Sequence, residues 1–146
     1  MIGYHFTSLK AWKKIQKQGL KPSLNSTNFS NVIKKYSSNG FIWIFNKKLN
    51  IHQTLGMILW IIISCRTDNI VLLKIKYKKE QSVKYLYSKD TNGDELKLSH
   101  SMWDVGHIGH CDVKMDLLIE IIKPENITLI NYWNIKKWLI LKSNID

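Results

Sequence analysis

Apolar residues near the start of the chain recur at helical spacing: Leu9, Trp12 and Ile15. Ser8 precedes them, and serine is a favoured N-cap because its hydroxyl accepts from a free backbone N–H of the first turn. Gly19 and Pro22 then provide the residue types at which helices end. The pattern predicts a short strand over residues 3–7, followed directly by a helix that ends near Gly19.

Later apolar runs predict the remaining elements. GFIWIF at 40–45 is rich in β-forming residues and predicts a strand, whereas the apolar run within 51–64 predicts a buried helix. IVLLKIKY at 70–77 alternates apolar residues with lysine at its end, which is typical of a half-buried strand. Further extended segments are expected at 85–87, 117–122 and 127–130, with a strand or short helix at 135–141. This order predicts one α+β domain over residues 1–146, with two early helices packed on mixed or antiparallel sheets.

Composition narrows the cellular setting. The chain has 146 residues, of which 45% are hydrophobic and 23% charged, ordinary values for a soluble globular protein. Its longest apolar run, Leu55 to Ile63, is far shorter than the roughly 20 residues that span a bilayer. Two cysteines, Cys65 and Cys111, are too few for a disulfide framework. We therefore expect a soluble, cytoplasmic protein with no membrane partner.

The net charge of +11 favours a polyanionic partner such as DNA or RNA, because bound lysines release condensed counterions. A solvated lysine surface that reflects coding bias explains the same excess, and both interpretations stay open. Arg66 is the one arginine among 22 basic residues. A site that needs several arginines for bidentate phosphate recognition is therefore excluded.

YHFTS at 4–8 is the first segment with candidate chemistry. Strand alternation places His5 and Thr7 on one face and Tyr4 and Phe6 on the other. An imidazole beside a hydroxyl forms a compact hydrogen-bonding pair that suits ribose hydroxyls or an amide. Taken alone, the pair is better explained as the face of a strand that meets water.

A second segment, VKMDLLIEIIKPENI at 113–127, contains two carboxylates. Asp116 and Glu120 are four residues apart, so a strand through this segment would carry both on one face. A carboxylate within an apolar strand is costly unless it is paired or functional. The pattern fits either a working carboxylate or an edge strand with one wet face.

A third segment, SHSMWDVGHIGHCD at 99–112, contains possible metal ligands. His107, His110 and Cys111 are close in sequence, but no second cluster with matching spacing accompanies them. We therefore predict a loop and no metal. The chain also lacks a Walker A loop, a G-x-G-x-x-G motif and a G-x-S-x-G elbow.

Taken together, the segments resemble the ADP-ribosyltransferase-like superfamily over residues 3–131. YHFTS and the helix that ends in GLKP resemble its first motif. GFIWIF, with the helix and IVLLKIKY that follow it, resembles its second strand and the elements after that strand. KMDLLIEIIKPENI resembles the terminal strand that carries the catalytic carboxylate. In overall look the chain is most similar to DNA-modifying toxins of the DarT type and to small phage or bacterial relatives.

This resemblance implies an ADP-ribosyltransferase-like split β-sheet core with a few helices packed on it. It implies that NAD, as substrate, binds in a cleft between two sheets and gives its ADP-ribose to a macromolecular acceptor. A carboxylate would stabilise the oxocarbenium-like state. His5 would hold a ribose hydroxyl of NAD with Thr7 beside it, and Tyr36 or Trp43 would pack on the nicotinamide.

The sequence departs from the superfamily at the carboxylate, which is usually glutamate. Asp116 occupies that place, with Glu120 further along the same predicted face, so either is the candidate catalytic residue. The helix after GFIWIF also lacks the tyrosine of the histidine–tyrosine–glutamate class. Two alternatives therefore stand beside a transferase: a catalytically silent nucleotide- or protein-binding module, and a basic nucleic-acid-binding protein in which YHFTS is scaffold.

Overall fold

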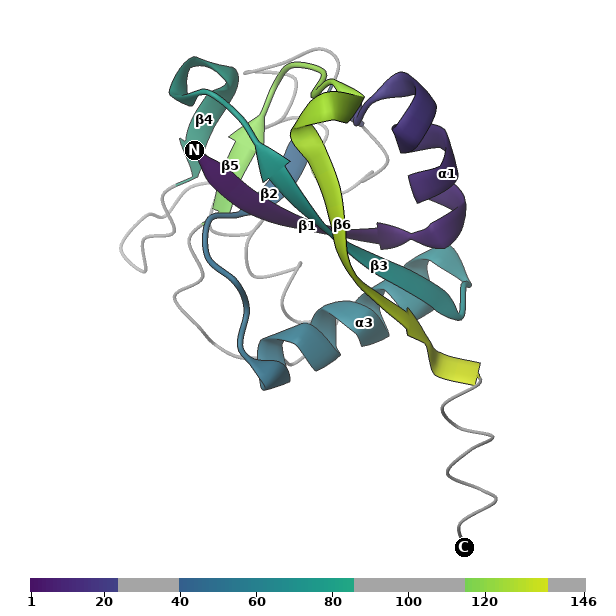
Figure 1. The fold of residues 1–146 in the computed structure, drawn as a ribbon. Helices are drawn as coiled ribbons and strands as arrows, with labels where there is room; N and C mark the ends of the chain where they lie inside the picture. Colours follow the sequence, from purple (N-terminus) through teal and green to yellow (C-terminus); the bar gives the residue numbers. More distant parts are fainter. Residues whose placement is uncertain (24–39, 86–114, 137–146) are drawn as a thin grey trace, which may run out of the picture.

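An antiparallel sheet of six strands, in the order β4-β5-β2-β1-β3-β6, organises the computed structural model, which describes residues 1–23, 40–85 and 115–136. Helices α1 and α3 lie on opposite sides of this sheet (Figure 1). Every neighbouring pair of strands runs antiparallel. The predicted mixture of helices with antiparallel strands is therefore confirmed.

The elements follow one another in this order: β1 Ile2–Ser8, α1 Leu9–Gln18, β2 Ile42–Phe45, α3 Ile51–Cys65, β3 Asn69–Lys76, β4 Ser82–Tyr85, β5 Met115–Leu118 and β6 Ile127–Asn134. Two 3-10 turns accompany them, η2 Lys79–Gln81 and η3 Pro124–Asn126. The early predictions agree within one or two residues. The strand predicted at 117–122 is wrong in its bounds, because β5 ends at Leu118. The segment at 99–112 lies outside the described residues.

Helix α1 begins and ends as its sequence predicts. The Ser8 hydroxyl accepts from the N–H of Ala11 at 3.1 Å, and the N–H of Gly19 donates to the carbonyl of Ile15. Gly19 has a φ of 78°, and a side chain there would collide with the carbonyl oxygen of Ile122. Leu20 and Ile122 exchange two backbone hydrogen bonds of 2.9 Å. The end of α1 is thus attached to the segment before η3.

Helix α3 has a complete capping box. Asn50 and Gln53 bond reciprocally through side chain and backbone at 2.8 and 2.9 Å. Its inner residues are buried against the sheet, whereas a stripe at intervals of four is exposed: Ile51, Leu55, Leu59 and Ile63. The prediction of a buried helix is therefore correct for only one face of α3. Among the described helices, none is long and apolar enough to cross a membrane.

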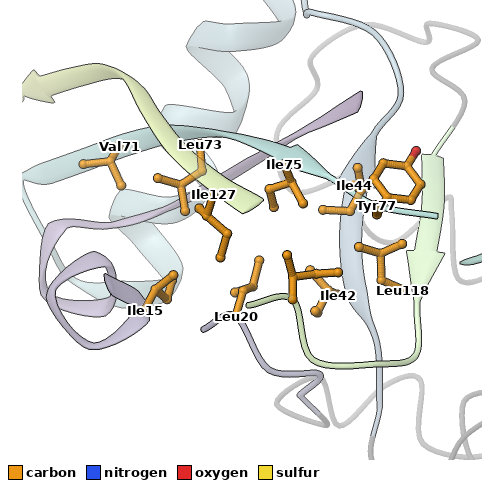
Figure 2. Packing of buried hydrophobic residues seen from close by; sticks show 11 residues of the cluster. Ile15, Leu20, Ile42, Ile44, Val71, Leu73, Ile75, Tyr77, Leu118 and Ile127 are labelled. Atoms are coloured by element: carbon orange, nitrogen blue, oxygen red, sulfur yellow. The ribbon is translucent and has the colours of Figure 1, made fainter. Parts of the chain in front are cut away.

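The sheet separates two apolar clusters. The first, which we call the α1-side cluster, contains residues of α1 and every second residue of β3 (Figure 2). The second, the α3-side cluster, gathers Phe6, Phe45 and Trp133 with α3. Phe6 meets Phe45 edge-on with ring centres 6.0 Å apart and stacks on Trp133 at 6.1 Å. Both faces of the central strands are therefore covered by packed side chains.

The junction between β1 and β2 is narrow. β1 pairs with β3 from Ile2↔Lys76 to Ser8↔Ile70, but it meets β2 at the single register pair Tyr4↔Phe45. Beside that pair, a Cβ on Gly3 would overlap the Cγ2 methyl of Ile44 and lie 3.1 Å from the Tyr77 ring. Glycine at position 3 is therefore what allows the two strands to approach.

Replacement of Gly3 by alanine should destabilise the protein by about 1–3 kcal/mol, because the added methyl overpacks a site whose neighbour Ile44 is fully buried. Urea unfolding measures the loss. Ile44→Ala alone should also destabilise, by about 2–5 kcal/mol. The double variant should lose less stability than the sum of the two single losses, because Ile44→Ala removes the Cγ2 methyl that the new side chain at position 3 would overlap. Strictly additive losses would contradict the close approach.

Candidate functional site

His5 and Thr7 lie on the α1 side of the sheet. His5 is opposite Leu73 and Thr7 is opposite Val71, and both partners belong to the α1-side cluster. Phe6, between them in sequence, points into the α3-side cluster. Since directly opposite residues share a face, the predicted alternation of YHFTS is confirmed. Both His5 and Thr7 are half-buried.

A hydrogen bond to the next strand fixes the imidazole of His5. Its Nδ1 lies 2.9 Å from the carbonyl oxygen of Trp43. A carbonyl only accepts, so Nδ1 carries the proton and Nε2 of the neutral ring is an acceptor. Burial lowers the pKa of His5, and the bond to Trp43 opposes that shift. The ring therefore presents a neutral acceptor nitrogen at neutral pH.

Asp116 lies on the same side of the sheet as His5. The two residues end a row of opposed positions that runs from His5 through Ile44 to Asp116. Asp116 is opposite Ile44 on β2, and the antiparallel register set by Tyr4↔Phe45 brings His5 opposite Ile44 from the other side. Two strand spacings separate the backbones of His5 and Asp116, which is about 10 Å. The row is closed at its centre, because Ile44 is 0% exposed and Asp116 only 5%.

Tyr77 is the partner of Asp116. Its hydroxyl donates to Oδ2 of Asp116 at 2.5 Å, and both residues are buried. Burial raises the pKa of Tyr77, and the hydrogen bond and charge of Asp116 raise it further, so the phenol stays protonated. The backbone of Tyr77 is held by the N-terminus, whose ammonium donates to its carbonyl at 2.7 Å.

Glu120 lies apart from this row. It follows the end of β5 in a bend, is exposed, and accepts from Nε2 of Gln81 at 3.3 Å. The N–H of Ile119 donates to the carbonyl of Gln81, which ties this segment to η2 at the outer end of the sheet. The expectation that Asp116 and Glu120 share one strand face is therefore wrong, because the strand ends between them.

The predicted aromatic residues do not join His5 in the described part of the structure. Trp43 packs with the α3-side cluster, so its ring is on the opposite side of the sheet from His5 and only its carbonyl meets the imidazole. Tyr36 lies outside the described residues, as do His107, His110 and Cys111. Within the described ranges, no three potential metal ligands gather.

The sequence did not indicate Tyr77. Its position at the end of a β-rich run marks it as an ordinary strand residue, and it is 39 positions from Asp116. The sequence does indicate that Asp116 needs a partner, because a carboxylate buried in an apolar strand is costly when unpaired, but it does not indicate which residue that partner is. Chemically, the row combines an acceptor nitrogen, the Thr7 hydroxyl and an oriented carboxyl group. Such groups can bind hydroxyls and stabilise positive charge.

Replacement of Tyr77 by phenylalanine should cost about 1–3 kcal/mol, because Asp116 loses its buried donor. The effect should depend on pH. A raised pKa in the folded state contributes stability that is complete below the unfolded tyrosine pKa and is lost as the pH rises through the folded pKa. Urea unfolding from neutral to alkaline pH should therefore show a shallower alkaline decline for Tyr77→Phe than for the wild type.

Tyr132→Phe is the matched control, because its hydroxyl bonds to Asn69 at 2.6 Å on the exposed surface. It should change stability by less than about 0.5 kcal/mol. Equal losses in the two variants would contradict the special role of the buried pair.

Titration of His5 should reduce stability toward acid pH, whereas titration of Tyr77 reduces it toward alkaline pH. Because the folded pKa is lowered, His5 contributes stability that is present above the unfolded pKa and is lost as the pH falls through the folded pKa. We expect wild-type stability to decrease below about pH 6.5 and His5→Gln to flatten that decline. An NMR titration of the His5 ring that gives a midpoint at or above 6.5 would contradict the burial of this imidazole.

Comparison with known proteins assigns no relative to the chain: no family model matches it, and no curated protein matches it with significance.

Proposed function

We propose that the chain is an NAD-dependent mono-ADP-ribosyltransferase that transfers ADP-ribose to a macromolecular acceptor, with nucleic acid favoured by the net charge of +11. The supporting observation is the row in which His5 and Asp116 flank β2 on one side of the sheet. The narrow β1–β2 junction fits a core that divides there, as the resemblance of the sequence implies.

In this proposal His5 binds NAD through Nε2, which accepts from a ribose hydroxyl, and Thr7 adds a second polar group on the same face. The glycosidic bond between C1′ and the nicotinamide nitrogen breaks, and neutral nicotinamide leaves with the bonding electrons. A carboxylate stabilises the oxocarbenium-like ribose. The acceptor then bonds to C1′ and gives up its proton to the carboxylate or to water.

Asp116 is favoured over Glu120 as that carboxylate. Asp116 shares the face of His5, whereas Glu120 is exposed beyond the strand and engaged with Gln81. In this assignment Tyr77 is a positioning residue, because it acts through its hydrogen bond to Asp116. Asp116 must then become accessible when NAD binds, since only 5% of it is exposed.

The same burial favours a second candidate, a catalytically silent module that binds a nucleotide or a protein. Asp116 is already paired with Tyr77, and fully buried Ile44 separates it from His5. In that case the carboxyl group supports the fold, and His5 with Thr7 forms a binding edge without chemistry.

Two measurements on the same samples distinguish these functions. NAD should raise the melting temperature of the wild type, and labelled NAD should transfer label to DNA, RNA or protein. His5→Ala should reduce both effects. Asp116→Asn keeps an acceptor for Tyr77 and should therefore fold and bind NAD, but transfer label at least about 100-fold more slowly, as expected for loss of an electrostatic catalyst.

Glu120→Gln is the matched control, because it removes an exposed carboxylate without touching the row. It should retain transfer. If Glu120→Gln abolishes transfer and Asp116→Asn does not, the carboxylate assignment is reversed. Stabilisation by NAD without transfer to any acceptor supports the silent module, and absence of both effects excludes the two nucleotide-based functions together.

A further inference from the structure

Helix α1 has one face made of lysine. We call Lys10, Lys13, Lys14 and Lys17 the lysine face, and all four are exposed. With about 100° between successive residues, they fall within an arc of about 100°. Ala11, Trp12 and Ile15 lie on the other side of the helix and pack on the α1-side cluster. The lysine face therefore points away from the sheet.

Neighbouring charges extend this surface. Exposed Lys21 follows the Gly19 cap, and the bridge between Leu20 and Ile122 holds exposed Lys123 beside the end of α1. Helix α1 chiefly contacts β1, β3 and η3. Within α1 and those three elements, Glu125 of η3 is the only acidic residue. Among the described residues, the surface around α1 is thus strongly basic.

The lysine face is unfavourable for the isolated helix. Lys10 and Lys14, and Lys13 and Lys17, are like charges at i and i+4, and two further pairs are three residues apart. The first turn has no acidic residue, although the helix dipole favours one there. A polyanion that binds this face would relieve the repulsion, which a neutral partner would not.

The residue types of the face indicate which polyanion. Bases of single strands stack on aromatic side chains, but Trp12, the aromatic residue of α1, packs on the core. Helices that lie in membranes insert large apolar residues, and the exposed side of α1 offers lysine and glutamine instead. Lysine is a point charge suited to phosphate oxygens, and contacts to phosphate carry no sequence information. These features fit the phosphate backbone of a duplex.

We propose that the lysine face of α1 binds the phosphate backbone of duplex nucleic acid without sequence preference. From Lys10 to Lys17 the helix rises about 10 Å, a length over which a duplex carries several phosphates. The inference goes beyond the ADP-ribosyl transfer proposed above, because this binding needs neither NAD nor the His5–Asp116 row.

Fluorescence anisotropy without NAD tests the proposal on labelled duplexes of about 20 base pairs, DNA and RNA in separate arms, over a range of salt. The test variant replaces all four lysines of the face by glutamine. The control variant replaces four exposed lysines elsewhere: Lys47, Lys48, Lys76 and Lys79. Both variants have the same net charge, so the comparison isolates the position of the lysines.

The test variant should bind duplex about 10²–10³-fold more weakly near 0.15 M salt, and its plot of log K against log salt should be shallower by about 3–4, the value for four lost phosphate contacts. The fold-loss of affinity in the control variant should be less than a tenth of the fold-loss in the test variant. Binding of either duplex through the lysine face supports the proposal, and comparison of the two arms shows whether DNA or RNA is bound more tightly. Transfer of label plays no part, so failure of binding is distinguishable from failure of the enzyme.

Several outcomes would overturn the proposal. Equal losses in the test and control variants would assign the binding to net charge, and absence of duplex binding by the wild type would remove it altogether. A single strand bound as tightly as the duplex would exclude a duplex backbone site. Vesicles of equal phosphatidylcholine and phosphatidylglycerol, bound through the same four lysines, would indicate a membrane surface instead.

The test variant should fold, because glutamine is a good helix former and the substitutions remove like-charge pairs. Circular dichroism should show a melting temperature at or above that of the wild type. If the quadruple variant does not fold, Lys13→Gln with Lys17→Gln leaves the first turn intact. That double variant should reduce the salt slope by about 2, and an unchanged slope would overturn the proposal.

Discussion

The rest of the structure depends on the narrow junction at which β1 meets β2. Gly3 has no side chain, so Ile44 and Tyr77 can occupy the space beside it. Tyr77 in turn reaches Asp116 on β5, two strands from β1. One close approach between the backbones of β1 and β2 therefore leaves room for the ring of Tyr77, which pairs with Asp116. His5 adds a side-chain bond across the same junction, where the described backbone pairing is limited to one position.

The two helices could be predicted from sequence because their signals are local. Ser8, Gly19 and the helical spacing between them define α1 without reference to any other part of the chain. The burial of α3 could not be predicted in the same way. Its sequence is apolar on every side, so only the sheet decides that Ile58 and Ile61 are buried while Leu55 and Leu59 are exposed.

The candidate site could be predicted only in part, since it combines a local pattern with distant contacts. Alternation along YHFTS places His5 and Thr7 together, because a strand of that length has a fixed period. Just beyond the end of β5, the segment is held by Gln81 of a different part of the chain, whose carbonyl accepts from Ile119 and whose side chain donates to Glu120. A pattern within 113–127 contains no information about that contact. The pairing of Glu120 with Asp116 on one face was wrong for this reason.

Burial has different consequences for the two polar residues at the ends of the row, His5 and Asp116. For His5, burial favours the neutral ring, and the bond to Trp43 fixes the tautomer, so Nε2 is the acceptor nitrogen. For Asp116, burial among apolar residues is tolerated because Tyr77 donates to it, and that same contact occupies an oxygen that chemistry would need. In the proposed binding module, His5 would contact the ligand and Asp116 would stay paired with Tyr77. In the proposed transferase, buried Ile44 would have to give way, since it lies between His5 and Asp116. Binding and catalysis therefore make different demands on one short contact between strands.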